Sequence, residues 1–171
     1  MQRYLILLAC LVLHTEALCQ PQPTSILQAS DATAFSYFGF STATSNNLIA
    51  IGAPRDDESG LNSGAVYVFR REGTEWIEEA KLLAGPFARI GGRLGSSLAI
   101  FESPTGDTAR IFAGASDDGI GPGGNLHVIE YGRIDGEWQL ISALESGESN
   151  VFDGFGSDIE VSLDGNLLAI G

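Results

Sequence analysis

Hydrophobic positions after residue 24 fall into short runs, and Gly or Pro interrupts every stretch that keeps a helical spacing. One group of runs rich in β-forming residues lies at 40–44, 48–52, 65–69 and 76–83. A second group lies at 96–101, 110–114, 126–131 and 138–144. The gaps between the runs are rich in Asn, Asp, Gly and Pro, which favour turns. The pattern therefore predicts an all-β chain of short antiparallel strands.

Some of these runs are apolar at consecutive positions, as in 48–51 and 66–69. A strand of that kind needs cover on both of its faces. Four-stranded sheets that stack face to face provide such cover, and this is the arrangement in a β-propeller. We therefore expect each group of four runs to form one propeller blade.

The two groups belong to an internal repeat of about sixty residues. An apolar residue followed by glycine recurs at Gly39, Gly95 and Gly156. Three further markers recur in the same order: Ile51-Gly52-Ala53-Pro54 with Ala113-Gly114-Ala115-Ser116 and Ile170-Gly171, Gly64 to Phe69 with Gly124 to Ile129, and Glu75-Trp76 with Glu137-Trp138. The repeat predicts one unit at 34–88, a second at 89–150 and a third, cut short, at 151–171. Together they would form a partial ring of about two and a half blades.

The amino terminus has the pattern of a secretory signal peptide over residues 1–19. Arg3 precedes the apolar run 5–13, and Ala17 and Cys19 suit positions −3 and −1 of a cleavage site before Gln20. A lipoprotein signal ending at Cys10 is the alternative, but its apolar stretch would be short. Cleavage before Gln20 would leave no cysteine, which excludes a disulfide scaffold and a Cys-ligated zinc site.

Residues 20–33 form the next segment. Within it, residues 25–29 precede Gly39 at nearly the same distance as residues 80–84, a predicted strand, precede Gly95. We therefore expect a fourth strand without its first three. Such a strand would close a larger ring by completing its final blade. Because propellers usually have about four to eight blades, we expect the sequence to be a fragment of a longer chain.

The order Phe38-Gly39, Gly52-Ala53-Pro54 and Gly64 to Phe69 resembles the FG-GAP repeat, found in the propeller of integrin α-chains and in many secreted or surface proteins. The second unit departs from this motif at Leu94 and Ser116. A kelch-type propeller is the rival, because Gly123-Gly124, Tyr131 and Trp138 follow the kelch order. The first unit has Ser63-Gly64 in place of the diglycine, which weakens the rival, and a WD40 propeller is disfavoured because no Trp-Asp pair occurs.

Many members of the FG-GAP family carry an Asp-x-Asp-x-Asp-Gly calcium loop between the first two strands of a blade. The corresponding segments here are 44–47, 102–107 and 163–166, and none offers three spaced carboxylates. We therefore expect no metal or cofactor site in this chain, and calcium only in blades that it lacks.

Acidic residues outnumber basic ones by 22 to 9, which gives a formal charge of −13. Nucleic acids and anionic membranes attract basic patches, so neither is an expected partner. No segment after the signal is long and apolar enough to span a membrane. The chain should therefore be secreted or lie at the cell surface.

Two acidic groups, Asp56-Asp57-Glu58 and Asp117-Asp118, fall in equivalent loops after the Gly-Ala marker. They could form a weak cation site or an acidic ring on one propeller face. Solvated turn-forming residues are the favoured interpretation, because Asp caps turns and adjacent carboxylates point apart in an extended loop.

No residue pattern indicates catalysis. His127, aligned with Tyr67 by the repeat, lies in an apolar strand, so packing explains it better than a role as general base. The glycine-rich stretch 119–124 lacks the following helix that a phosphate-binding loop requires. Trp76 and Trp138 could stack on a carbohydrate, but their matched positions favour packing between blades, in like environments a rotation apart.

The resemblance implies a non-catalytic propeller that binds or adheres to an extracellular protein or glycan. The alternatives are an accessory propeller of a secreted hydrolase or lyase, whose catalytic residues lie outside this chain, and a purely structural repeat protein of the envelope. We expect no catalytic residue in this chain.

Overall fold

The computed structural model describes residues 26–31, 33–115, 127–147 and 154–171. Blade 1 is a four-stranded antiparallel sheet of β1 (Thr42–Thr44), β2 (Leu48–Ala53), β3 (Ala65–Glu72) and β4 (Glu75–Leu82). Blade 2 repeats it with β5 (Leu94–Glu102), β6 (Ala109–Ala115), β7 (His127–Ile134) and β8 (Glu137–Glu145). A terminal hairpin follows, made of β9 (Ile159–Val161) and β10 (Leu168–Ile170). The all-β prediction and the plan of four strands per unit are confirmed.

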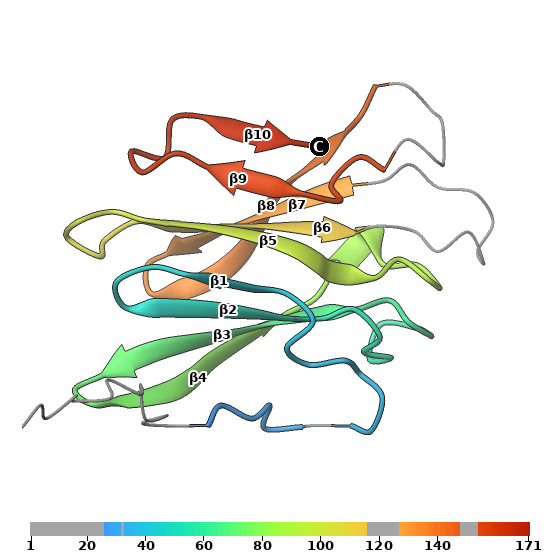
Figure 1. Ribbon diagram of the computed structural model, residues 1–171, viewed down its shortest axis with the longest axis horizontal. Coiled ribbons are helices and arrows are strands. Elements are labelled where there is room, and N and C mark those ends of the chain that lie inside the picture. Colours follow the sequence, from blue (N-terminus) through green and yellow to red (C-terminus); the bar gives the residue numbers. More distant parts are fainter. Residues whose placement is uncertain (1–25, 32, 116–126, 148–153) are drawn as a thin grey trace, which may run out of the picture.

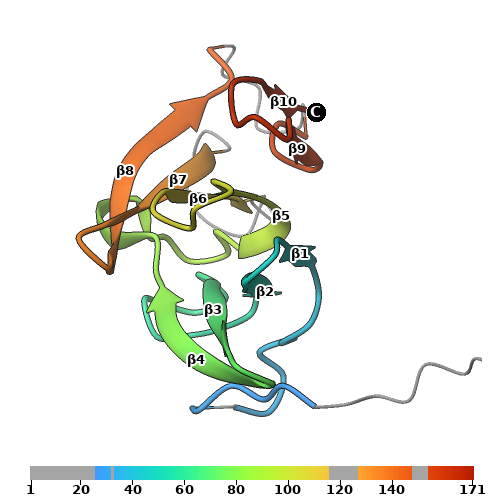
Figure 2. The same ribbon diagram turned by 90° about the vertical axis from the view of Figure 1, so that its left-hand side faces the viewer.

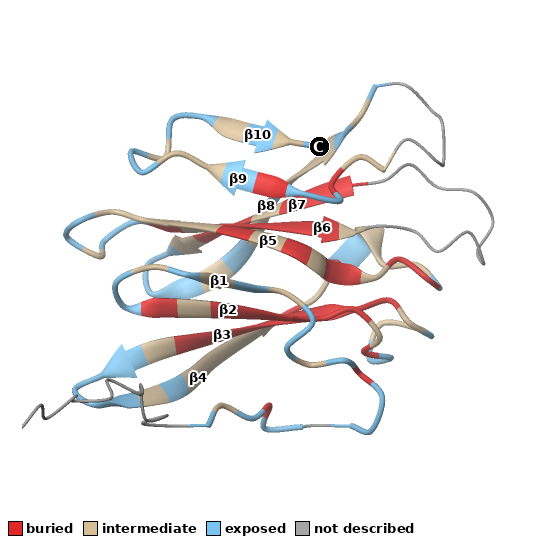
Figure 3. Ribbon diagram, viewed as in Figure 1, coloured by how far each residue is buried: buried red, intermediate tan, exposed pale blue. Residues whose placement is uncertain are grey.

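The blades stack as layers, with the terminal hairpin beyond blade 2 and the amino-terminal segment 26–40 on the other side of blade 1 (Figures 1 and 2). The only regular helix in the described residues is a short 3₁₀ turn, η1 (Gly85–Phe87), in the linker between the blades. Strand β3 shows why the layers are needed. Val66 and Val68 face a core shared with blade 2, whereas Tyr67 and Phe69 face one shared with the amino-terminal segment. The buried positions therefore run through the middle of each sheet (Figure 3), as consecutive apolar residues predict.

The repeated glycines mark a close backbone contact between successive layers. A Cβ atom on Gly52 would lie 2.0 Å from the carbonyl oxygen of Gly95, and one on Gly114 would lie 2.3 Å from that of Gly156. The carbonyl of Gly95 also accepts a hydrogen bond from Ser41 Oγ at 2.7 Å, and Ser97 Oγ donates to Gly156 at 2.5 Å. The Gly-Ala marker of one unit therefore packs against the apolar-Gly marker of the next.

Trp76 and Trp138 occupy like environments, as predicted. Trp76 is paired across its hairpin with Arg71, and Trp138 with Arg133. Trp138 packs on the core between the two blades, and Trp76 packs on the core beneath the amino-terminal segment. The indole of Trp138 donates a hydrogen bond to Glu79 Oε2 of blade 1 at 3.2 Å, which ties the two outer strands together.

Glu79 joins the blades electrostatically, since its Oε1 atom also lies 2.9 Å from Arg70 Nε and 2.8 Å from Arg133 Nη2. Burial alone would raise the pKa of Glu79, but the hydrogen bonds from Arg70 and Trp138 and the charges of both arginines hold it below its usual value. The stabilisation from this carboxylate is therefore present above the pKa of the unfolded chain, about 4.3. It is lost as the pH falls through the lower folded-state pKa.

Glu79→Gln should lower the free energy of unfolding by about 2 kcal/mol at pH 7, because charge-assisted hydrogen bonds contribute about 1.5–3 kcal/mol each. The difference from the parent should shrink toward zero in acid. Urea denaturation at pH 7 and pH 3 measures both values. Glu75→Gln, at an exposed position of the same strand, is the matched control. A deficit that stays constant with pH would contradict the assigned role.

Strand register corrects one detail of the repeat alignment. Gly52 is paired with Val66 and Gly114 with Val128, so His127 corresponds to Ala65 and not to Tyr67. The marker comparison placed the two strands two residues out of register. Because side chains alternate between faces, a shift of two keeps the same face, and the error leaves the strand prediction intact.

The amino-terminal segment differs in part from its prediction. Residues 26–31 are not assigned to a strand, although Leu27 and Ala29 pack on the face of blade 1 while Ile26 and Gln28 are exposed. This alternation is that of a strand, and Leu27 and Ala29 occupy the place that Leu82 and Ala84 occupy on blade 2. Residues 26–31 are not a strand of a sheet, because they make no backbone–backbone hydrogen bond with another described residue.

The two ends of the layers differ. Tight turns at 45–47, 73–74, 103–108, 135–136 and 162–167 gather at one end, on the left of Figure 1. The long connections 54–64 and 83–93 lie at the opposite end, on the right. We call these the turn end and the loop end.

Candidate functional site

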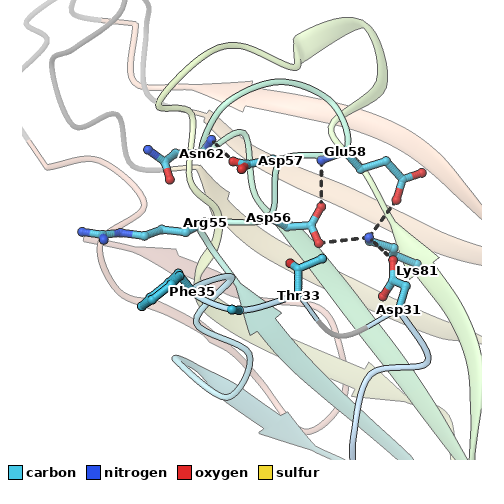
Figure 4. A pocket seen from close by; sticks show the side chains of 10 residues that line it. Asp31, Thr33, Phe35, Arg55, Asp56, Asp57, Glu58, Asn62 and Lys81 are labelled. Atoms are coloured by element: carbon cyan, nitrogen blue, oxygen red, sulfur yellow. Dashed lines mark hydrogen bonds and ion pairs between the residues drawn. The ribbon is translucent and has the colours of Figure 1, made fainter.

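The acidic residues of loop 54–64 lie at the loop end, and the side chain of Asp57 points away from those of Asp56 and Glu58 (Figure 4). Asp56 is only 3% exposed, and its Oδ1 atom accepts a hydrogen bond from the backbone N–H of Glu58 at 3.0 Å. Asp57 is exposed, and its Oδ1 accepts from the backbone N–H of Asn62 at 2.7 Å. The prediction that neighbouring carboxylates point apart is therefore confirmed. The interpretation as solvated turn residues holds for Asp57 and is wrong for Asp56, which is buried.

Lys81, near the end of β4, explains the burial of Asp56. Its Nζ atom lies 2.5 Å from Asp31 Oδ2, 3.0 Å from Asp56 Oδ2 and 2.7 Å from Glu58 Oε2. The hydroxyl of Tyr67 lies 2.7 Å from Asp31 Oδ1 and 3.1 Å from Asp56 Oδ2, so it can donate its proton to either. Three segments of chain therefore meet at one ammonium group (Figure 4). We call these five residues the Lys81 cluster.

The protonation states of the Lys81 cluster follow from its geometry. Burial alone would lower the pKa of Lys81, but its hydrogen bonds to Asp31 and Glu58 raise it well above its usual value. The pKa of Asp31 is lowered by its hydrogen bonds with Lys81 and Tyr67. Burial and the hydrogen bond to Asp31 raise the pKa of Tyr67. The amine is therefore charged at neutral pH and is not a nucleophile or a general base.

Every member of the Lys81 cluster except Tyr67 lines an open pocket of about 430 Å³. Phe35 and Arg55 border the same pocket, as do Thr33 and Asn62. Among the described residues, no group of three or more His, Cys, Asp or Glu side chains is arranged to hold a metal ion. The carboxylates of Asp31, Asp56 and Glu58 instead share the ammonium group of Lys81 as their counter-ion. The pocket therefore has the character of a polar binding surface.

Phe35 is exposed on this surface in a conformation that favours glycine. Its φ is 75° and its side chain is 83% exposed. The corresponding residue before blade 2 is Gly91, with φ 74°. Left-handed backbone costs a non-glycine residue about 1–2 kcal/mol, and an exposed ring recovers little of that by burial.

Phe35→Gly should therefore raise the free energy of unfolding by up to about 1 kcal/mol, after the larger chain entropy of glycine is subtracted. Thermal denaturation of the purified variant measures the change. The control is Phe40→Gly, whose position has no left-handed backbone to relieve and which should not stabilise the chain. A loss of stability in Phe35→Gly would show that the ring makes contacts worth more than the strain.

His127 is buried and packs against Phe87, with ring centroids 5.6 Å apart, in agreement with the packing interpretation. Its Nε2 atom lies 2.5 Å from Arg89 Nη2. Burial and the charge of Arg89 lower the pKa of His127 despite Glu145 nearby, so the ring is neutral at pH 7. The candidates Asp117-Asp118 and 119–124 lie outside the described residues.

All three segments compared with calcium loops have other polar roles. Glu102 Oε2 accepts hydrogen bonds from Ser45 Oγ at 2.6 Å and from the backbone N–H of Asn47 at 3.0 Å, which joins the turn ends of the two blades. Asp164 accepts from Ser162 Oγ and from Asn166 within its own turn, which lowers the pKa of Asp164 to about 2. These carboxylates stabilise turns.

Sequence reasoning missed Lys81 and Asp31, which organise the pocket. The sequence did carry a signal for Lys81, because this basic residue stands between Ala80 and Leu82, and both of these neighbours pack in the core. Asp31 carried none, because its contact with Lys81 depends on how the amino-terminal segment crosses blade 1.

Stacked four-stranded antiparallel sheets with glycine contacts between repeats define a propeller-type repeat protein. Within the described residues, no helix is long and apolar enough to cross a membrane. Residues 23–69 match the model of the FG-GAP repeat, and this part of the chain is an FG-GAP repeat. No curated protein matches the chain. FG-GAP repeat domains are generally non-catalytic and typically extracellular.

Proposed function

We propose that the chain belongs to a secreted or cell-surface FG-GAP propeller that binds an extracellular protein or glycan through its loop end, without catalysis. The observation that carries this proposal is the asymmetry of the layers. Long connections and exposed aromatic rings gather at the loop end, whereas the other end has short turns. Functional residues concentrate in loops held by a rigid scaffold.

The domain plan supports export of this scaffold. In our proposal residues 1–19 are a signal peptide, 20–33 hold a ring-closing strand, and 34–88, 89–150 and 151–171 are successive repeats. Leu27 and Ala29 support the ring-closing role, because they already cover blade 1 as a preceding blade would. Expression with the leader and sequencing of the secreted amino terminus should find Gln20 first.

Binding by the loop end can be tested with the exported protein. Its binding to an array of extracellular-matrix proteins and glycans should fall when Phe35 and Leu61, both exposed at the loop end, are replaced by Ser. The matched control replaces Ile134 and Leu163, exposed on turn-end hairpins, and should bind normally. Loss of binding in the turn-end variant alone would overturn the proposal, as would turnover of an array glycan by the parent chain.

A further inference from the structure

A small hollow of about 90 Å³ lies at the loop end where blade 1 meets blade 2. It is lined by Tyr37, Phe40, Pro54, Arg55, Arg93 and Ser96. Because both blades contribute to its wall, the hollow depends on a junction already formed within the chain. A water molecule takes about 30 Å³ of liquid, so the hollow has room for one small side chain.

Arg55 gives the hollow an unusual charge for this protein. The chain has 22 acidic and 9 basic residues. Even so, the guanidinium of Arg55 has no carboxylate ion-pair partner among the residues that the structure describes. It lies instead over the ring of Tyr37, 4.3 Å from the ring centre. Stacking restricts the plane of the guanidinium, and a fixed planar guanidinium is suited to pairing with a carboxylate through two parallel hydrogen bonds.

Two exposed aromatic side chains line this cationic hollow. Phe40 is 60% exposed and Tyr37 is 46% exposed. Leu61 and Ile90, exposed at the same end, come from the loop and the linker on either side of the junction. Arginine and tyrosine are enriched at the energetic centres of protein interfaces, and the hollow brings Arg55 and Tyr37 together.

We propose that the hollow receives an Asp or Glu side chain of a protein partner, which pairs with Arg55. This inference rests on the proposed function, because it specifies the partner of the loop end. A sugar ring is a poorer occupant, since Ser96 is the only neutral aliphatic hydroxyl among the six lining residues, and a sugar presents several hydroxyl groups. A second copy is poorer still, because two chains that each carry a formal charge of −13 repel each other.

The inference can be tested on the full mature chain without knowledge of the partner. The probe is N-acetyl-glutamate methylamide, titrated against isotope-labelled protein and followed by nuclear magnetic resonance. The amides of Tyr37 and Ser96 and the side chain of Arg55 should shift and saturate at millimolar probe. N-acetyl-glutamine methylamide, which has the same shape without the charge, should bind at least tenfold more weakly. Methyl glucuronide, a sugar that carries a carboxylate, tests whether the hollow binds an acidic sugar in preference to an acidic side chain.

Arg55→Gln should weaken glutamate binding at least tenfold, and so should Tyr37→Asn. Tyr37 has a φ of 59°, and asparagine removes the stacking ring while tolerating this left-handed backbone. Arg71→Gln makes the same charge change on an exposed site of blade 1 and should bind as the parent does. Equal binding of the two peptide probes, an unaffected Arg55→Gln protein, or tighter binding of the glucuronide would each overturn the inference. Loop-end binding on the array could still persist, so failure here differs from failure of the proposed function.

Discussion

Gly52→Ala is expected to lower the free energy of unfolding by about 3 kcal/mol or more, the upper part of the range for overpacked cores. The added Cβ would lie 2.0 Å from the carbonyl oxygen of Gly95 and 2.4 Å from Ser41 Oγ. The serine can rotate away, but the carbonyl belongs to the backbone of the next blade. The layers must therefore separate, and the apolar core between them becomes less closely packed. Guanidinium denaturation of the mature chain measures the loss.

Substitutions at two further glycines test whether the loss comes from the contact between the blades or from alanine in a strand generally. Gly114 lies in the same relation to Gly156 as Gly52 does to Gly95, so Gly114→Ala should be similarly costly. A Cβ on Gly132 would instead meet the side chain of Ile141 at 3.0 Å, and that side chain is partly exposed and can move. Gly132→Ala should therefore change stability by less than about 1 kcal/mol. If all three variants lose equal stability, the inter-blade contact is not the cause.

The layered fold was predictable because its signals are local. Consecutive apolar residues at 66–69 require two covered faces, and the glycine markers recur in a fixed order. The ends of the eight strands in the two blades follow from this pattern within three residues. The pairing of His127 was not predictable from the markers, because the sequence 116–126 differs in composition from 54–64 and the register is set by strand hydrogen bonds.

The polar site was less accessible to sequence reasoning. Asp56 was recognised as a candidate, but its burial depends on Lys81 and on Asp31, which the fold brings to it from two other segments. Arg55 and Tyr37 likewise meet only because the amino-terminal segment runs along loop 54–64, where the backbone N–H of Arg55 donates to the carbonyl of Ser36 at 3.1 Å. Contacts of this kind are set by tertiary structure and leave no periodic signal.

Lys81→Met should lower the free energy of unfolding by about 3 kcal/mol at pH 7, because it leaves a buried carboxylate without its counter-ion. The side chain of Asp56 is only 5% exposed, so solvent compensates poorly for the lost ammonium. Asp31 and Glu58 are about half exposed and should contribute little. Methionine retains much of the length of the lysine stem, so lost packing is a small part of the change. Urea denaturation at pH 7 gives the value.

A second substitution identifies which carboxylate carries the cost. In the double variant Lys81→Met/Asp56→Asn, the buried charge is gone, while the asparagine oxygen can still accept from the backbone N–H of Glu58. The double variant should therefore recover at least half of the stability that Lys81→Met loses. Glu58→Gln in the parent should cost no more than about 0.5 kcal/mol, because that carboxylate is solvated. If the double variant is no more stable than Lys81→Met, the ammonium stabilises the chain by holding Asp31 and the amino-terminal segment, and not by neutralising Asp56.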